Sequence, residues 1–107
     1  MEEEKMRVMQ RGIMKILPGK MVEAMKLNEK YMASMKRYGV PSMRMYRPFV
    51  GGGDYMHTVI FEVEWDSFEK MAAFFEKIME DKEVQEMMPQ WEELMDSHEV
   101  ELYTSMS

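Results

Sequence analysis

The sequence predicts an α+β fold in which a four-stranded antiparallel sheet carries helices on one face. Two observations predict it: the apolar period switches between strand-like alternation and helical spacing along the chain, and turn residues stand at the switches. The resulting order is strand, helix, two strands, two helices, strand. That order is typical of the ferredoxin-like split βαβ unit, whose sheet order is 4-1-3-2 with strands numbered along the chain. The 107 residues suit a single domain, 1–107.

The first strand is predicted over residues 6–17, where apolar and polar side chains alternate. Its expected inward face is Met6, Val8, Gln10, Gly12, Met14 and Ile16. Pro18-Gly19 ends the alternation, and a helix is expected to run to about Tyr38, where Gly39 suits a left-handed residue at the end of a helix and Pro41 prevents its resumption. The expected buried stripe of this helix is Met21, Ala24, Met25, Asn28, Tyr31, Met32, Met35 and Tyr38.

Residues 42–50 and 55–65 predict a hairpin around Gly51-Gly52-Gly53-Asp54. Asp66-Ser67-Phe68-Glu69 has the form of a capping box, with Asp66 as the N-cap of the next helix. The stripe expected for that helix is Phe68, Met71, Ala72, Phe75, Ile78 and Met79. After Asp81 a further helix is expected to bury Val84, Met87, Met88, Trp91, Leu94 and Met95, with an interruption or kink at Pro89. The last strand is predicted at HEVELYT, residues 98–104.

Charges on the face away from the helices test the sheet order independently. The first strand carries Arg7, Arg11 and Lys15 there, and the strands expected on either side carry Glu62 and Glu64 or Glu99 and Glu101. Opposite charges on neighbouring strands stabilise a sheet, so the pattern agrees with the order 4-1-3-2. Because Met9, Ile13, Ile60 and Tyr103 share this face, we expect a partner to cover it.

The composition excludes several classes of function. A net charge of −6 without a basic run opposes nucleic-acid binding. No apolar stretch approaches the roughly 18 residues of a membrane span, and the acidic N-terminus is unlike a signal peptide, so a cytoplasmic protein is expected. The chain has no cysteine, which removes thiolate chemistry, and no histidine spacing typical of a metal site. We expect neither metal nor cofactor.

The chain resembles a known superfamily at Leu17-Pro18-Gly19-Lys20, at Phe61-Glu62-Val63-Glu64-Trp65 and at Asp81-Lys82-Glu83-Val84-Gln85-Glu86. These segments look like the dimeric α+β barrel superfamily, and the chain looks closest to its NIPSNAP-like and antibiotic-biosynthesis-monooxygenase-like domains. The resemblance implies a homodimer whose sheets face each other and a small pocket in each subunit. Members of the superfamily include cofactor-independent monooxygenases, haem-degrading enzymes and proteins without known activity. The Asn, Trp and His of the haem-degrading branch are not carried over to this chain.

Polar residues on apolar faces are the candidate site residues, because burying an unpaired polar group is unfavourable. Gln10, Asn28, His57 and Arg47 lie on expected inward faces and could converge on one cavity. Taken singly, each is better explained as a structural polar group with a partner in the fold, and only convergence on one cavity would favour a site. His57 is the candidate acid or base, since an imidazole titrates near neutrality. Tyr31 could stack on an aromatic ligand.

Two functions remain open, and a haem-handling variant is a third possibility that a shifted haem absorption band on addition of haemin would reveal. The first is an enzyme of the cofactor-independent oxidising kind that holds a small apolar or aromatic substrate in a methionine-lined pocket. The second is a non-catalytic ligand-binding module or a structural or regulatory dimer. The 17 methionines favour adaptable core packing over a Cu(I) site built from pairs such as Met32 and Met35.

Overall fold

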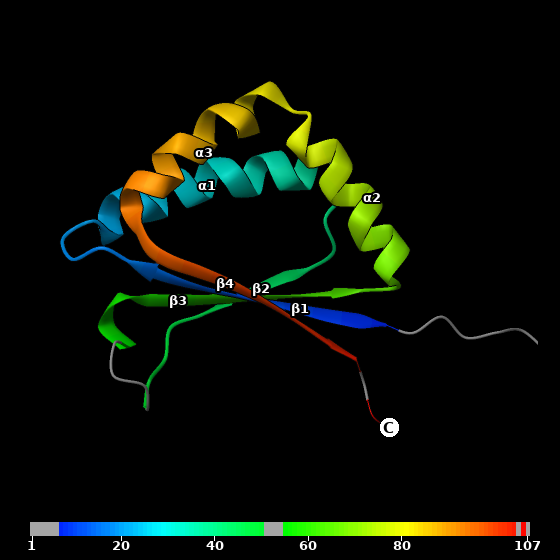
Figure 1. Cartoon of the computed structure of the whole chain (residues 1–107), viewed down its shortest axis with the longest axis horizontal. Coiled ribbons are helices and arrows are strands. Elements are labelled where there is room, and N and C mark those ends of the chain that lie inside the picture. The colour runs from blue at the N-terminus through cyan, green and yellow to red at the C-terminus, as the bar shows by residue number, and fades with distance from the viewer. Residues whose placement is uncertain (1–6, 51–54, 105, 107) are drawn as a thin grey trace, which may run out of the picture.

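The computed structural model contains one antiparallel sheet with the strand order β2-β3-β1-β4 (Figure 1). The structure describes residues 7–50, 55–104 and 106. The strands are β1 (Val8–Ile16), β2 (Met43–Tyr46), β3 (Thr58–Trp65) and β4 (Met95–Thr104). The predicted fold class and the predicted strand order are confirmed.

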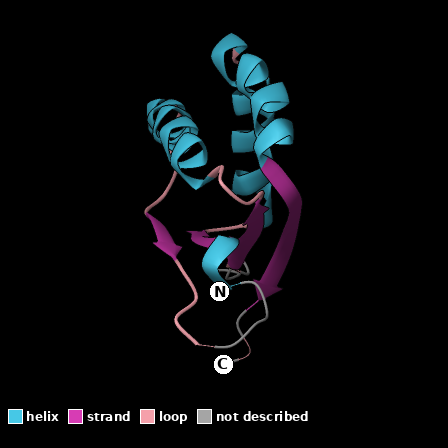
Figure 2. Cartoon of the chain, turned by 90° about the vertical axis from the view of Figure 1, so that its left-hand side faces the viewer, coloured by secondary structure: helices cyan, strands magenta, loops and turns pink. Residues whose placement is uncertain are grey.

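The helices α1 (Met21–Arg37), α2 (Phe68–Met79) and α3 (Lys82–Leu94) all stand on one side of this sheet (Figures 1 and 2). Gly39 has a φ of 84°, so the left-handed residue expected after the first helix is present. α3 continues through Pro89, contrary to the expected interruption. The Pro89 side chain is exposed, and the ring removes one helical hydrogen bond without ending the helix.

The core between sheet and helices consists of two clusters. The inward face predicted for the first strand is confirmed at the described positions, since Val8, Gln10, Gly12, Met14 and Ile16 are all buried. One cluster gathers around Trp91 and includes Ile16 and Leu27. The other gathers around Trp65 and includes Met35 and Ile78.

The helical stripes differ in part from the prediction. In α2 the buried residues are Met71, Phe74 and Ile78, whereas Phe68 is 55% exposed and Met79 is 48% exposed. The N-cap is Ser67, whose Oγ accepts a hydrogen bond of 3.2 Å from the Lys70 amide. The expectation that Asp66 caps this helix was wrong by one residue. Asp66 instead lies 3.7 Å from the ammonium of Lys70, as an exposed ion pair.

The first helix also buries residues outside its predicted stripe. Leu27 and Ser34 are buried, and Tyr38 is exposed because it lies beyond the last helical residue. The Tyr38 hydroxyl donates a 2.7 Å hydrogen bond to Asp81, which is the N-cap of α3. This bond ties the end of α1 to the start of α3.

The strands of the predicted hairpin are shorter than expected. β2 ends at Tyr46, two residues before Pro48, because proline has no amide hydrogen for the sheet and restricts the residue before it. Residues Tyr55–His57 form the 3₁₀ helix η1 instead of extending β3. The predicted turn Gly51-Gly52-Gly53-Asp54 lies outside the described residues.

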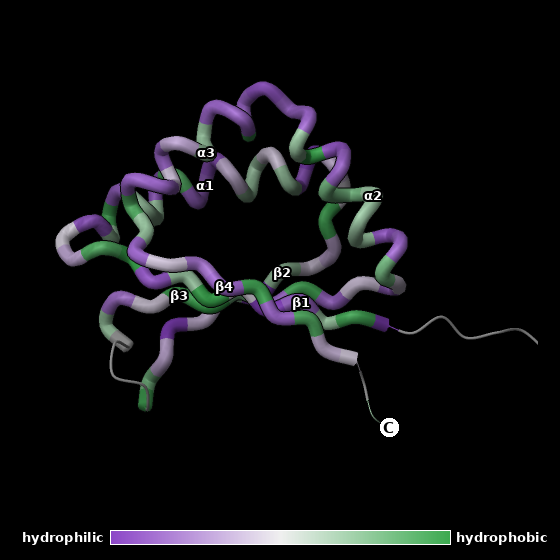
Figure 3. The backbone as a smooth tube through the Cα atoms, viewed as in Figure 1, coloured by the Kyte–Doolittle hydropathy of each residue, from purple (hydrophilic) through white to green (hydrophobic). Residues whose placement is uncertain are grey.

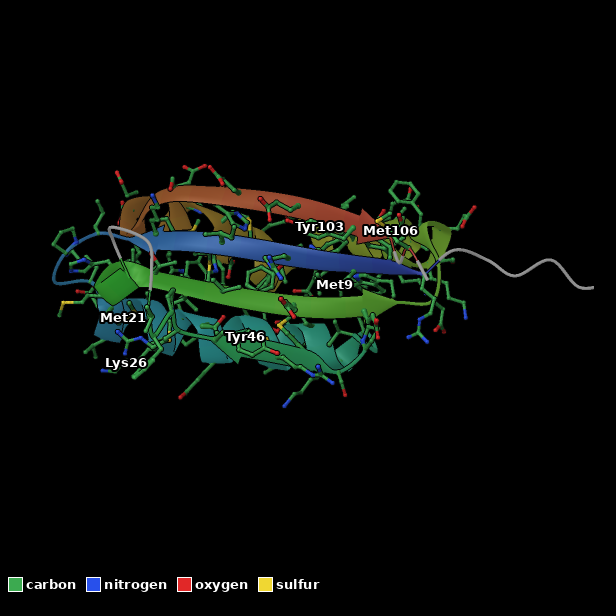
Figure 4. All side chains as sticks on the ribbon, turned by 90° about the horizontal axis from the view of Figure 1, so that it is seen from below. Met9, Met21, Lys26, Tyr46, Tyr103 and Met106 are labelled. Atoms are coloured by element: carbon green, nitrogen blue, oxygen red, sulfur yellow. The ribbon has the colours of Figure 1, made fainter. Side chains whose placement is uncertain are left out.

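None of the helices α1, α2 and α3 in the described part of the chain covers the face of the sheet away from them (Figures 1 and 3). On it Arg11 pairs in register with Glu62 on one side and Glu101 on the other. The Arg11 guanidinium bonds the Glu62 carboxylate at 2.7 and 3.0 Å, and its central carbon lies 5.3 Å from the ring centre of Tyr103. Met9, Tyr46 and Tyr103 project from this same face, as Figure 4 shows. We call it the open sheet face.

Candidate functional site

A cavity of about 130 Å³ lies between the helix-bearing face of the sheet and helices α1 and α3. Residues of all four strands and of helices α1 and α3 form its wall. The lining residues are Met14, Asn28, Tyr31, Met32, Met43, Phe61, Met88, Trp91, Met95 and His98. The surface that they present is almost entirely apolar.

The floor of the cavity depends on the pairing of Gly12 in β1 with Phe61 in β3. A side chain at position 12 would overlap the Phe61 ring, so only glycine lets this ring lie across the neighbouring strand. The Phe61 ring centre is 6.3 Å from that of His98 in β4. An aromatic floor therefore spans β3, β1 and β4.

Half of the lining residues are methionines, and they come from five different elements. Methionine is unbranched and carries a polarizable sulfur, so its side chain adapts to irregular shapes and packs well against aromatic rings. The wall can therefore adjust to apolar ligands of differing outline.

Polar groups in the lining come from Asn28, Tyr31 and His98. Asn28 Nδ2 lies 3.3 Å from the sulfur of Met45, which is a weak acceptor. Partial burial lowers the pKa of His98 below its usual 6.5, so the imidazole is neutral at pH 7. Burial raises the pKa of Tyr31, and its hydroxyl therefore stays protonated.

The structure brings Asn28 and Tyr31, two of the residues that the sequence singled out, to this cavity. It places Gln10, Arg47 and His57 outside the lining. Gln10 is buried and its Oε1 accepts a 2.9 Å hydrogen bond from Trp65 Nε1, which is the structural alternative considered for it. Arg47 is exposed and donates to the Met56 carbonyl at 3.1 Å. His57 closes η1.

Sequence reasoning gave His98 no special weight, although the structure places it in the cavity wall. The available signal was alternation, which puts His98 on the same face of its strand as Val100 and Leu102. The register Met14↔His98 then turns that face toward the helices. This register is a property of the assembled sheet and cannot be read from the strand alone.

Within residues 7–50, 55–104 and 106, no group of three or more histidine, aspartate or glutamate side chains could hold a metal ion. In the same part of the chain, no helix has both the length and the apolar character to cross a bilayer.

Comparison with solved structures places this architecture among known folds. A NIPSNAP family protein from Agrobacterium tumefaciens superposes with a TM-score of 0.80 at 21% identity, covering 100% of this chain and 92% of its own. An uncharacterized NIPSNAP domain protein from Burkholderia xenovorans gives 0.78 at 18% identity, with coverage of 94% and 95%. SnoaB from Streptomyces nogalater, a cofactor-independent oxygenase, gives 0.66 at 12% identity, with 94% of each chain covered.

The chain thus has the α+β fold shared by NIPSNAP family proteins and this oxygenase, which confirms at the level of the fold the resemblance seen in the sequence. No protein-family profile matches the sequence, and no curated protein matches it.

Proposed function

We propose that this protein binds a small apolar or aromatic molecule in the cavity between the sheet and helices α1 and α3. The observation that carries the proposal is the lining itself, in which adaptable methionines surround aromatic rings and a few polar groups. Concave, mostly apolar sites with a few placed polar groups are typical of small-molecule binding.

Toluene is a suitable first probe because it is apolar and aromatic. Titration calorimetry should give a saturable isotherm, and toluene should raise the melting temperature, since a ligand that binds only the folded state stabilises it. Met88→Trp adds bulk in the cavity wall and should abolish binding. Met79→Trp is the matched control, because Met79 is 48% exposed and does not line the cavity. No binding to the parent protein, or equal binding to both variants, would contradict the proposal.

Cofactor-independent oxidation is the second candidate activity, supported by the imidazole of His98 in the wall and by the likeness of fold to SnoaB. Such chemistry needs a base that removes a proton from the substrate. Oxygen uptake with each aromatic that binds, compared between His98→Ala and the sequence-derived candidate His57→Ala, identifies the base. Absence of uptake with every bound aromatic favours the non-catalytic binding module.

The proposed assembly is a homodimer formed through the open sheet face. Its support is the mixture on that face of partly exposed apolar residues, such as Ile13 and Ile60, with the Arg11 and Glu62 pair. The loop after β2 descends on the same side of the sheet (Figure 1) and exposes 91% of Phe49. A two-fold arrangement would bury both features at once.

A further inference from the structure

We infer that the cavity selects a neutral, single-ring aromatic molecule that carries a hydroxyl or carbonyl oxygen, and that Asn28 or His98 recognises this oxygen. The inference rests on the proposed binding function and specifies its ligand. It follows from the size of the cavity, from the charge of its wall and from the hydrogen-bonding capacity of two side chains.

The size of the cavity limits the ligand to about one ring. Its volume is about 130 Å³. A buried apolar cavity of roughly 150 Å³ accommodates benzene. A fused two-ring system would need the wall to move. The Phe61 ring at the floor and Trp91 in the wall offer aromatic surfaces against which a flat ligand can pack.

The wall carries no permanent charge. None of the ten lining residues is Asp, Glu, Lys or Arg. Partial burial favours the neutral imidazole of His98 as well. A carboxylate or ammonium on the ligand would lose hydration without gaining a charged partner, so neutral ligands are preferred.

Asn28 and His98 have hydrogen-bonding capacity that the described residues leave unused. Asn28 donates only to the Met45 sulfur, and no group in the described part of the chain bonds its Oδ1. The ring nitrogens of His98 likewise have no hydrogen-bond partner among residues 7–50, 55–104 and 106. A ligand oxygen is a better acceptor than a thioether, and a hydroxyl can also donate to an amide oxygen or to a neutral imidazole.

The two groups lie on opposite sides of the aromatic floor. Asn28 contacts Met45 of β2, at one edge of the sheet, and His98 belongs to β4, at the other edge. Phe61 of β3 lies between them. The His98 side chain reaches solvent although its ring is partly desolvated, and Asn28 is half-buried, so both stand where the apolar interior meets solvent. A ring held over Phe61 can direct an oxygen toward either group.

The test compares p-xylene and p-cresol, which have similar shapes and differ in one methyl and one hydroxyl group. Calorimetry gives a dissociation constant for each, and the ratio of p-xylene to p-cresol reports the contribution of the oxygen. Asn28→Leu, His98→Leu or both should lower this ratio about three- to tenfold, the effect of one lost hydrogen bond. His57→Leu is the matched control, because it removes the other histidine, which is outside the lining. It should change the ratio less than about twofold.

Binding of p-xylene is itself the folding control, since a variant that binds it retains the cavity. The charged probe 4-methylbenzoate should bind the parent protein at least about tenfold more weakly than p-cresol. An unchanged ratio in both cavity variants, an equal loss in His57→Leu, or equal affinity for 4-methylbenzoate would overturn the inference. In those cases the proposed function survives if p-xylene still binds. Failure of the parent protein to bind either neutral probe would overturn both.

Discussion

Gly12 shows how one missing side chain can shape a site. It is buried in the middle of β1, where a larger residue would normally contribute to the core. The Phe61 ring occupies the space above it and forms the cavity floor. The pair therefore couples the packing of the sheet to the shape of the proposed ligand site.

Gly12→Ala should destabilise the protein by about 1–3 kcal/mol, because the new methyl group collides with Phe61 in a packed core. Urea unfolding measures the loss. Phe61→Leu should relieve the collision, so the double variant should be more stable than the sum of the two single effects predicts. Strict additivity would mean that the ring does not occupy the position above Gly12.

His98 should titrate below its usual pKa of about 6.5, because partial burial disfavours the imidazolium. Between the folded and unfolded pKa values the unfolded chain binds more protons, so the free energy of unfolding rises with pH in this window. The contribution of His98 to the free energy of unfolding is fully present above about pH 6.5. It falls as the pH decreases toward the lower pKa of His98 in the folded state. An NMR titration of the His98 ring protons measures the pKa. A value at or above 6.5 would remove the basis for a neutral imidazole in the cavity wall.

Among single residues, the sequence identifies Asn28 as a candidate site residue but does not identify His98, and the difference has a physical reason. Asn28 places a polar amide on the apolar face of its helix, and the helical spacing of the sequence is enough to show this. His98 shares a strand face with Val100 and Leu102, but at the first position of the predicted strand this polar residue does not by itself indicate a site. It becomes notable only through its pairing with Met14 and its approach to Phe61.

Among the elements, β1 organises the sheet, since it lies between β3 and β4 and presents Arg11 to glutamates on both sides. Arg11→Glu should place like charges beside Glu62 and Glu101 and should lower the stability by about 1 kcal/mol or more, since each cross-strand pair contributes roughly 0.2–1 kcal/mol.

Lys36→Glu is the control for Arg11→Glu, because Lys36 lies exposed in the last turn of α1, away from the sheet. Thermal unfolding of the two variants compares them directly. Equal losses of melting temperature would show that net charge, and not the strand neighbours, sets the effect.

Helix termini show where sequence reasoning reaches its limit at this scale. Asp66 and Ser67 are both good capping residues, and only backbone geometry decides between them. Ser67 is extended and accepts the amide of Lys70, so the helix begins one residue later than predicted. Ser67→Ala should therefore destabilise the protein by about 1 kcal/mol in urea unfolding, whereas Asp66→Ala should have a smaller effect.

At the scale of the whole molecule, the three α-helices of the described residues all cover the same face of the sheet (Figure 2). The order of elements was predictable because alternation, helical stripes and turn residues are local signals. The sheet order followed from that order of elements, and the charges on neighbouring strands agreed with it. Which side of α2 is buried was not predictable from the sequence. Phe68, Phe74 and Phe75 are all suited to a core, and only the packing of the folded chain selects among them.

Light scattering at micromolar concentration should give twice the chain mass of 12.8 kDa, as expected for a dimer through the open sheet face. Ile13→Lys should shift the protein toward monomer by placing a charge in the middle of that face. Val22→Lys is the control, because Val22 is 69% exposed on α1, on the opposite side of the sheet. A monomeric parent, or a dimer that Ile13→Lys leaves intact, would contradict this assembly.

The chain contains two tryptophans, and each core cluster has one. Trp91 lines the cavity, whereas the indole of Trp65 is held by Gln10 at the far end of the sheet. Their emission can therefore be separated by replacing either one with phenylalanine. A protein that keeps only Trp91 would report the arrival of a ligand, and one that keeps only Trp65 would report melting of the other cluster. The molecule thus carries a built-in pair of fluorescent probes that distinguishes occupancy of the site from loss of the fold.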